Sequence, residues 1–154
     1  MALDIRPITA TLGAEVRGVD MARVDDGTRD ELRKAWLDHK VLVLRDQHIT
    51  TEEHIAFGRL FGDLEVHPFT DDDGEHPEIV VLHADGENRF VASGWHSDVT
   101  WREEPSMGSI LRGVIIPPAG GDTCFADATA AYDRLSDGWK DRLDGLVAVH
   151  DYLR

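Results

Sequence analysis

The stretch Gly94-Trp95-His96-Ser97-Asp98-Val99-Thr100-Trp101 is the part of this chain that most strongly constrains its interpretation. It is rich in the β-branched and aromatic residues that favour strands. In a strand, side chains two residues apart point to the same face, so this spacing predicts that His96 and Asp98 lie side by side. Two histidines and one carboxylate form the facial triad of non-haem Fe(II) oxygenases. The motif therefore offers two of three candidate metal ligands, and the third must come from elsewhere.

Composition places the chain among small globular proteins. It has 154 residues, of which 42% are hydrophobic and 30% charged, which predicts one soluble domain with a real core. A formal net charge of -14 argues against a nucleic-acid partner, which would need clustered Lys and Arg. No apolar run reaches membrane-spanning length and the amino terminus does not resemble a signal peptide, so we predict a cytoplasmic protein with no membrane partner.

Helices are predicted where a capping residue precedes apolar residues at helical spacing. A capping box opens each of two predicted helices, the first of which covers residues 29–39. Single capping residues open two short helices near the carboxyl end. The predicted caps are Thr28 with Glu31, Thr50 with Glu53, Asp127, and Ser136.

Strands are predicted at runs of apolar residues bounded by Pro, Gly and polar residues. The chain opens with a β segment within residues 3–16. Residues 41–44 form a short apolar run that is interpreted as a strand buried on both faces. Further strands are predicted at residues 79–83, 107–116 and 146–152.

Six blocks of sequence, in order and at compatible spacing, extend over essentially the whole chain. They are Gly13-Ala14-Glu15 with Gly18-Val19-Asp20, His39-Lys40-Val41-Leu42-Val43-Leu44-Arg45-Asp46-Gln47, Phe61-Gly62-Asp63-Leu64 with His67-Pro68, Trp95-His96-Ser97-Asp98-Val99-Thr100, Gly120-Gly121-Asp122-Thr123, and Ala130-Ala131-Tyr132 with Leu135. Together they resemble the TauD/TfdA family of Fe(II)- and 2-oxoglutarate-dependent dioxygenases.

The resemblance implies an α+β, mainly β fold: a partial double-stranded β-helix, jelly-roll and cupin-like, with flanking helices. Residues 1–154 would be the amino-terminal part of a single catalytic domain, ending before the barrel closes. The family's distal iron-binding histidine and its arginine for 2-oxoglutarate would lie beyond Arg154, so this chain alone is expected to be incomplete and inactive.

The same resemblance implies the cofactors and their ligands. His96 and Asp98 would bind Fe(II), and Thr123 would hydrogen-bond a carboxylate of 2-oxoglutarate, with O2 as the oxidant. No catalytic residue beyond the metal ligands is expected. The implied reaction is hydroxylation of a small organic substrate with release of succinate and CO2.

The resemblance also indicates three substrate-binding positions. His67 matches a loop residue that donates to the anionic group of sulfonates and sulfates. Thr70 and Ala92 stand where taurine-specific members have a tyrosine and an asparagine around the substrate amine. We therefore expect an anionic substrate without that amine: a sulfonate, a sulfate ester or a carboxylate.

Two other functions stay open at the level of sequence. His150 is the only histidine after Asp98, and as a third ligand it would make the chain a cupin-like metal enzyme. Alternatively, the chain is a non-catalytic or pseudoenzyme fragment. A homo-oligomer of the full-length protein is also left open.

Overall fold

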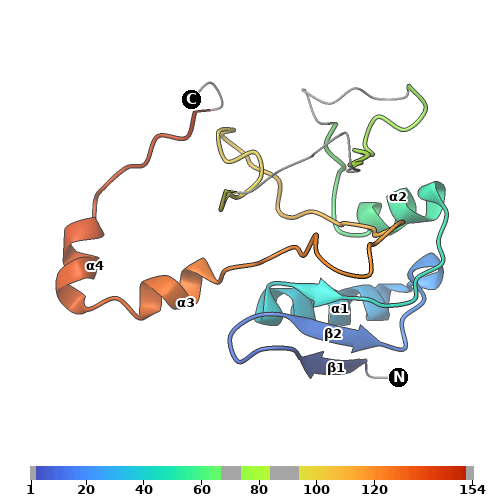
Figure 1. The fold of residues 1–154 in the computed structure, drawn as a ribbon, viewed down its shortest axis with the longest axis horizontal. Coiled ribbons are helices and arrows are strands. Elements are labelled where there is room, and N and C mark those ends of the chain that lie inside the picture. Colours follow the sequence, from blue (N-terminus) through green and yellow to red (C-terminus); the bar gives the residue numbers. More distant parts are fainter. Residues whose placement is uncertain (1–2, 67–73, 84–93, 152–154) are drawn as a thin grey trace. The chain divides into compact units, whose positions relative to one another are not determined.

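The computed structural model describes residues 3–66, 74–83 and 94–151. The chain divides into two compact units, one formed by residues 1–62 and 113–146 and the other by residues 63–112 and 147–154. All helices and strands assigned within the described residues belong to the first unit (Figure 1). In these residues, no helix is long and apolar enough to cross a membrane.

A small sheet opens the first unit, as the sequence predicts. Strand β1 (Asp4–Pro7) pairs antiparallel with β2 (Ala14–Arg17), and β2 pairs parallel with β3 (Leu42–Val43). The turn between β1 and β2 closes at Gly13, whose φ of +84° is accessible to glycine without a Cβ clash. The predicted strand at 41–44 is thus confirmed at two residues, which are half-buried and not buried on both faces.

Helix α1 (Asp26–His39) begins three residues before the predicted start at residue 29. The predicted capping box of Thr28 and Glu31 is wrong. Asp25 accepts the Thr28 backbone N–H at 2.7 Å, and the Glu31 carboxylate accepts the backbone N–H of Leu3 at 2.9 Å. An acidic N-cap upstream thus takes over the role assigned to Thr28, and Glu31 joins the helix to the start of β1.

The capping box of helix α2 (Thr51–Arg59) is confirmed. The Thr50 hydroxyl accepts the Glu53 backbone N–H at 3.2 Å, and the Glu53 carboxylate accepts the Thr50 N–H at 2.7 Å. A short 3-10 helix η1 (Met21–Arg23) precedes α1. Helices α3 (Ala128–Asp133) and α4 (Asp137–Leu143) form where predicted, although the Ser136 side chain makes no capping hydrogen bond.

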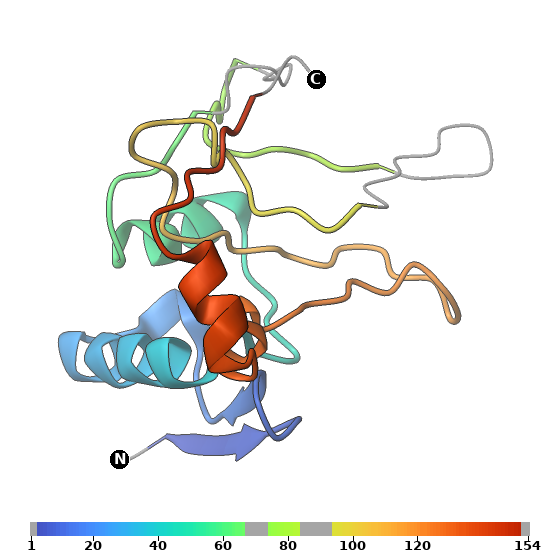
Figure 2. The same ribbon diagram turned by 90° about the vertical axis from the view of Figure 1, so that its left-hand side faces the viewer.

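The hydrophobic core of the first unit lies where α1, α2 and the sheet meet. Helix α1 runs along one face of the sheet in both ribbon views (Figures 1 and 2). Leu32 is 1% exposed and is the largest fully buried side chain among the described residues. It packs in one cluster with Val16, Met21, Ile49 and Phe57.

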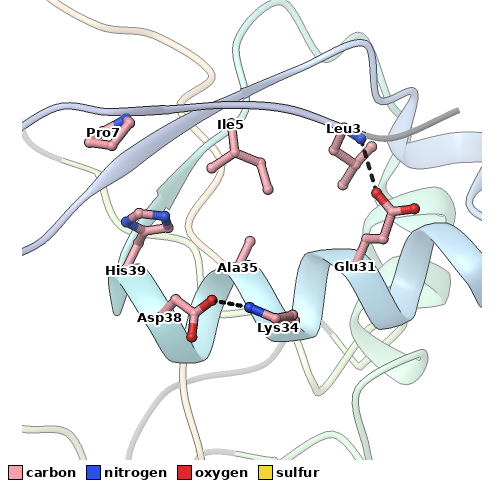
Figure 3. A pocket seen from close by; sticks show the side chains of 8 residues that line it. All are labelled: Leu3, Ile5, Pro7, Glu31, Lys34, Ala35, Asp38 and His39. Atoms are coloured by element: carbon pink, nitrogen blue, oxygen red, sulfur yellow. Dashed lines mark hydrogen bonds and ion pairs between the residues drawn. The ribbon is translucent and has the colours of Figure 1, made fainter.

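An open groove of about 330 Å³ lies between β1 and α1 (Figure 3). Leu3, Ile5 and Pro7 line it from the strand side, and Ala35 and His39 are among the residues of α1 that line the other side. None of the predicted site residues lines this groove, so it does not identify the functional site.

Asp127 joins two distant parts of the first unit. Its carboxylate accepts the Ala130 backbone N–H at 3.0 Å, which caps α3, and lies 3.1 Å from Lys40 Nζ at the end of α1. The side chain is only 6% exposed. The hydrogen bond from Ala130 and the contact with Lys40 lower the Asp127 pKa from its ordinary value of 3.8.

The sign of this shift gives a pH-dependent prediction. A carboxylate with a lowered folded-state pKa stabilises the protein above its unfolded pKa, and that contribution is lost as the pH falls. Asp127→Ala is therefore expected to lower the urea midpoint at pH 7, and the gap from wild type should narrow below about pH 4. Asp127→Asn keeps a side chain that can cap the helix, so it should lower the urea midpoint at pH 7 by less than Asp127→Ala does. A gap that stays constant down to pH 3 would contradict the assignment.

Three predicted strands are not formed within the described residues: those at 79–83, at 107–116 and over the described part of 146–152. Their sequences favour β structure, but a strand needs a neighbouring ladder for its backbone groups, and the described residues supply none to these segments. Their apolar side chains are correspondingly exposed, at 87% for Ile115 and 88% for Val149. The observed architecture is an α+β fold with an unclosed three-stranded sheet.

Candidate metal centre

The second unit carries the His96 and Asp98 pair. No strand is formed over residues 94–101, and residues 98–101 form a turn instead. The turn nevertheless brings the two side chains together, with His96 Nε2 3.3 Å from Asp98 Oδ1. The prediction that they lie side by side is confirmed, although a turn and not the strand pleat produces the contact.

The imidazole is oriented by its own backbone. His96 Nδ1 lies 2.8 Å from the Gly94 carbonyl oxygen. A carbonyl can only accept, so Nδ1 carries a hydrogen and donates to it, and Nε2 is the ring nitrogen that faces Asp98. This arrangement is the one in which a second hydrogen bond orients a metal-binding histidine.

The carboxylate is held in a matching way. Ser109 Oγ donates to Asp98 Oδ2 at 3.1 Å, so Oδ1 is the oxygen that faces the imidazole. Both side chains are more than half exposed, at 57% for His96 and 61% for Asp98. The pair is therefore open to a ligand from solvent.

The separation of the two donor atoms fits a shared cation. Two lone pairs facing each other require positive charge, either a proton on Nε2 or a metal ion bound by both atoms. Nitrogen and oxygen ligands about 2.1 Å from a metal and at right angles to each other lie about 3.0 Å apart. The distance of 3.3 Å between His96 Nε2 and Asp98 Oδ1 is close to that value.

The turn itself is strained. Val99 has a φ of +45° and is 8% exposed. A β-branched residue in the left-handed region is rare, and such a conformation costs about 1–3 kcal/mol unless surrounding contacts impose it. One such contact is the hydrogen bond from the Arg102 backbone N–H to the Val99 carbonyl oxygen, at 3.0 Å.

Glu65 anchors the chain that follows the turn. Its carboxylate lies 2.8 Å from Arg102 Nη1 and also accepts a hydrogen bond from the Ser106 hydroxyl. Glu65 and Arg102 are both largely covered, at 23% and 31% exposed, so this pair is better shielded from solvent than the His96 and Asp98 side chains. It fixes residues 102–106 against the segment that leads to residue 67.

The remaining predicted site residues fall into three groups. Thr123 lies in the first unit, exposed, in a segment without regular structure. His67, Thr70 and Ala92 lie outside the described residues. His150 contacts Thr100, and within the described part of the chain no third His, Cys, Asp or Glu joins His96 and Asp98 in a metal-binding group.

Sequence reasoning missed two contacts near the pair, those of Ser109 with Asp98 and of His150 with Thr100. Ser109 is separated from Asp98 by 11 positions, and His150 from Thr100 by 50. Neither separation matches a helical or strand period, so only the folded chain reveals these contacts. Trp95, which precedes His96 in the sequence, is 75% exposed.

Comparisons with known proteins identify the family of this chain. Residues 4–154 match the model of the family described as taurine catabolism dioxygenase TauD, TfdA. The chain is 38% identical to an (S)-phenoxypropionate/alpha-ketoglutarate-dioxygenase of Sphingobium herbicidovorans, over 97% of this chain and 53% of that protein. It is 36% identical to an alpha-ketoglutarate-dependent sulfate ester dioxygenase of Pseudomonas putida, over 97% of this chain and 50% of that protein.

A solved structure shares the fold. The crystal structure of a taurine dioxygenase from Burkholderia xenovorans superposes with a TM-score of 0.80 at 38% identity, covering 94% of this chain and 52% of that one. The chain thus spans about half the length of the curated relatives it matches. The family model covers nearly the whole chain, and the ordered blocks and the His96 and Asp98 pair fall within the matched residues. This chain therefore belongs to the TauD/TfdA dioxygenase family.

Proposed function

We propose that this chain forms the amino-terminal part of an Fe(II)- and 2-oxoglutarate-dependent oxygenase that hydroxylates a small anionic organic substrate. The observation that carries the proposal is the contact between His96 Nε2 and Asp98 Oδ1 at 3.3 Å. The other polar atom of each side chain is already held, by Gly94 and Ser109 respectively. The two atoms left over are the nitrogen and oxygen ligands that Fe(II) takes in a facial triad.

The role of this chain's residues is positioning. When bound, iron and 2-oxoglutarate supply the oxidative chemistry, in which O2 is consumed and succinate and CO2 are released. His96 and Asp98 would hold the metal on one side only, leaving positions open for the co-substrate. Thr123 would hydrogen-bond a carboxylate of 2-oxoglutarate. The hydrogen bonds at Gly94 and Ser109 keep both ligands oriented without reorganisation when the metal arrives.

The domain boundaries follow from the same proposal. Residues 1–154 would be the front half of a single catalytic domain, a double-stranded β-helix whose remaining strands and third metal ligand come from a following segment. Support comes from the half-length coverage of the relatives and from the exposed β-favouring segments, such as Ile115 and Val149. Such unpaired edges and faces are buried when a sheet closes. We place the complete enzyme in the cytoplasm.

The substrate class that we favour is a sulfate ester, a sulfonate or an aryloxy carboxylate. His67 would donate to its anionic group. Thr70 and Ala92 lack the tyrosine hydroxyl and asparagine amide that taurine-specific members use around the substrate amine, so taurine itself is disfavoured. Each missing hydrogen bond to a charged group costs about 1.5–3 kcal/mol, at least about tenfold in affinity.

Succinate release from the full-length protein tests this proposal. We expect succinate only when Fe(II), 2-oxoglutarate and O2 are all present, stimulated by a sulfate ester, a sulfonate or a phenoxypropionate. Taurine should stimulate succinate release at least about tenfold less than the best of these, if the amine contacts are missing. Omission of each component in turn is the control. Succinate formed equally without iron would contradict the reaction class, and taurine as the best substrate would contradict the substrate class.

A further inference from the structure

The turn that carries Asp98 contacts a segment far away in the chain. His150 Nδ1 lies 2.7 Å from Thr100 Oγ1. The two residues are 50 positions apart, and both belong to the second unit, which gathers residues 147–154 with residues 63–112. Because both side chains are polar and the distance is short, this contact is a well-formed hydrogen bond.

Thr100 also has a contact within its own segment. Its hydroxyl lies 3.5 Å from the Ser97 carbonyl oxygen. The contact with His150 Nδ1, at 2.7 Å, is the shorter of the two, and a hydroxyl can donate to or accept from an imidazole nitrogen. Thr100 thus bridges the start of the turn and the 147–151 segment, with Asp98 and Val99 enclosed between Ser97 and Thr100.

The strain at Val99 explains why such a bridge is needed. Left alone, a β-branched residue with a φ of +45° would relax to a more common conformation and carry Asp98 away from His96. Among the described residues, the contacts that oppose this relaxation include the Ser109 hydrogen bond to Asp98, the Arg102 hydrogen bond to Val99 and the His150 hydrogen bond to Thr100. Of these three, the last alone links the turn to the distant 147–151 segment.

We propose that His150 is a positioning residue for the metal pair, which it holds through Thr100, and not a metal ligand. This inference rests on the proposed function, since it assumes that His96 and Asp98 bind a metal ion. It adds to that function a role for the 147–151 segment, which would hold the turn that carries Asp98 in place without contacting the metal ion. Loss of a hydrogen-bonding partner of this outer kind typically lowers metal affinity by about 10- to 100-fold.

Titration of the metal-free full-length protein with Co(II), followed by calorimetry, tests the inference without turnover. His150→Ala and Thr100→Val should each weaken Co(II) binding by about tenfold or more. His150→Asn places an amide nitrogen where Nδ1 stood, so its affinity should stay within about threefold of wild type. The double variant should be no weaker than either single variant, because both remove the same hydrogen bond. If His150→Ala does not fold, Thr100→Ser provides the comparison with Thr100→Val: it keeps the hydroxyl and should bind Co(II) with nearly the affinity of wild type.

The control variant is His48→Ala, since His48 is an exposed histidine of the first unit, and it should bind Co(II) as wild type does. Unchanged binding by His150→Ala would overturn the inference. So would a loss in His150→Asn equal to that in His150→Ala with Thr100→Val unaffected, the pattern expected of a direct ligand. If wild type itself does not bind Co(II), both the proposed function and the inference are contradicted. If wild type binds Co(II), the results for the variants support or contradict the inference alone.

Discussion

His96→Ala is expected to abolish succinate formation by the full-length enzyme, and Asp98→Ala to do the same. Each change removes one of the two atoms that face each other at 3.3 Å. Removing only an outer hydrogen-bonding partner of a metal ligand already costs about 10- to 100-fold in affinity or activity. Loss of a ligand itself should therefore cost more than about a hundredfold. Iron content per chain should fall together with turnover, which separates lost metal binding from lost substrate binding.

Two further variants sharpen this test. Ser109→Ala removes the hydroxyl that donates to Asp98 Oδ2 but leaves both proposed ligands in place, so it should reduce activity by a smaller factor, about tenfold. His48→Ala, a histidine change in the first unit, should leave iron content and turnover unchanged. Near-normal turnover in His96→Ala with iron still bound would show that the pair is not the metal site.

Local signals allowed the sequence to predict much of the first unit. The reciprocal hydrogen bonds of Thr50 and Glu53 involve residues three positions apart, so their pattern is visible in the sequence and α2 forms as predicted. Helix α1 shows the limit of the same logic. Thr28 and Glu31 have the correct spacing, yet Asp25 is the cap and Glu31 contacts Leu3, which lies 28 positions away. A capping signal competes with tertiary contacts that the sequence does not display.

The strand predictions beyond the three-stranded sheet failed for a different reason. A β-favouring run such as residues 107–116 describes a side-chain preference, but a strand exists only when a neighbour accepts its backbone hydrogen bonds. The first unit supplies those neighbours for β1, β2 and β3. Among the described residues, nothing does so for 107–116, and side chains such as Ile115 stay exposed.

The contact between His96 and Asp98 was predictable from the sequence, but the backbone geometry that produces it was not. The spacing of His96 and Asp98 predicts a shared face for a strand, and the pair does come together. The turn that achieves this depends on a left-handed Val99, a conformation that the sequence argues against because valine disfavours it. The hydrogen-bonding partners on either side of Val99 are Ser109 at Asp98 and His150 at Thr100, and their separations from the turn follow no period.

Leu32→Ala is expected to cause a large loss of stability in the first unit. The side chain is 1% exposed and lies in the cluster with Val16, Met21 and Phe57, so its removal leaves a cavity beneath α1. Replacing a buried leucine by alanine costs about 2–5 kcal/mol, through lost hydrophobic transfer and the cavity together. Since a domain is stabilised by about 5–15 kcal/mol, this is a large share of the total. Urea unfolding followed by circular dichroism measures it.

The same helix provides the matched control. Leu37 lies on α1 five positions later and is 64% exposed, so Leu37→Ala deletes the same atoms from the same element without opening a cavity. Its effect should stay within about 0.5 kcal/mol, and alanine's higher helix propensity offsets part of any loss. The difference between the two variants isolates burial from helix propensity. Equal losses in Leu32→Ala and Leu37→Ala would show that α1 does not pack on the core through Leu32, and the arrangement of the first unit would then need revision.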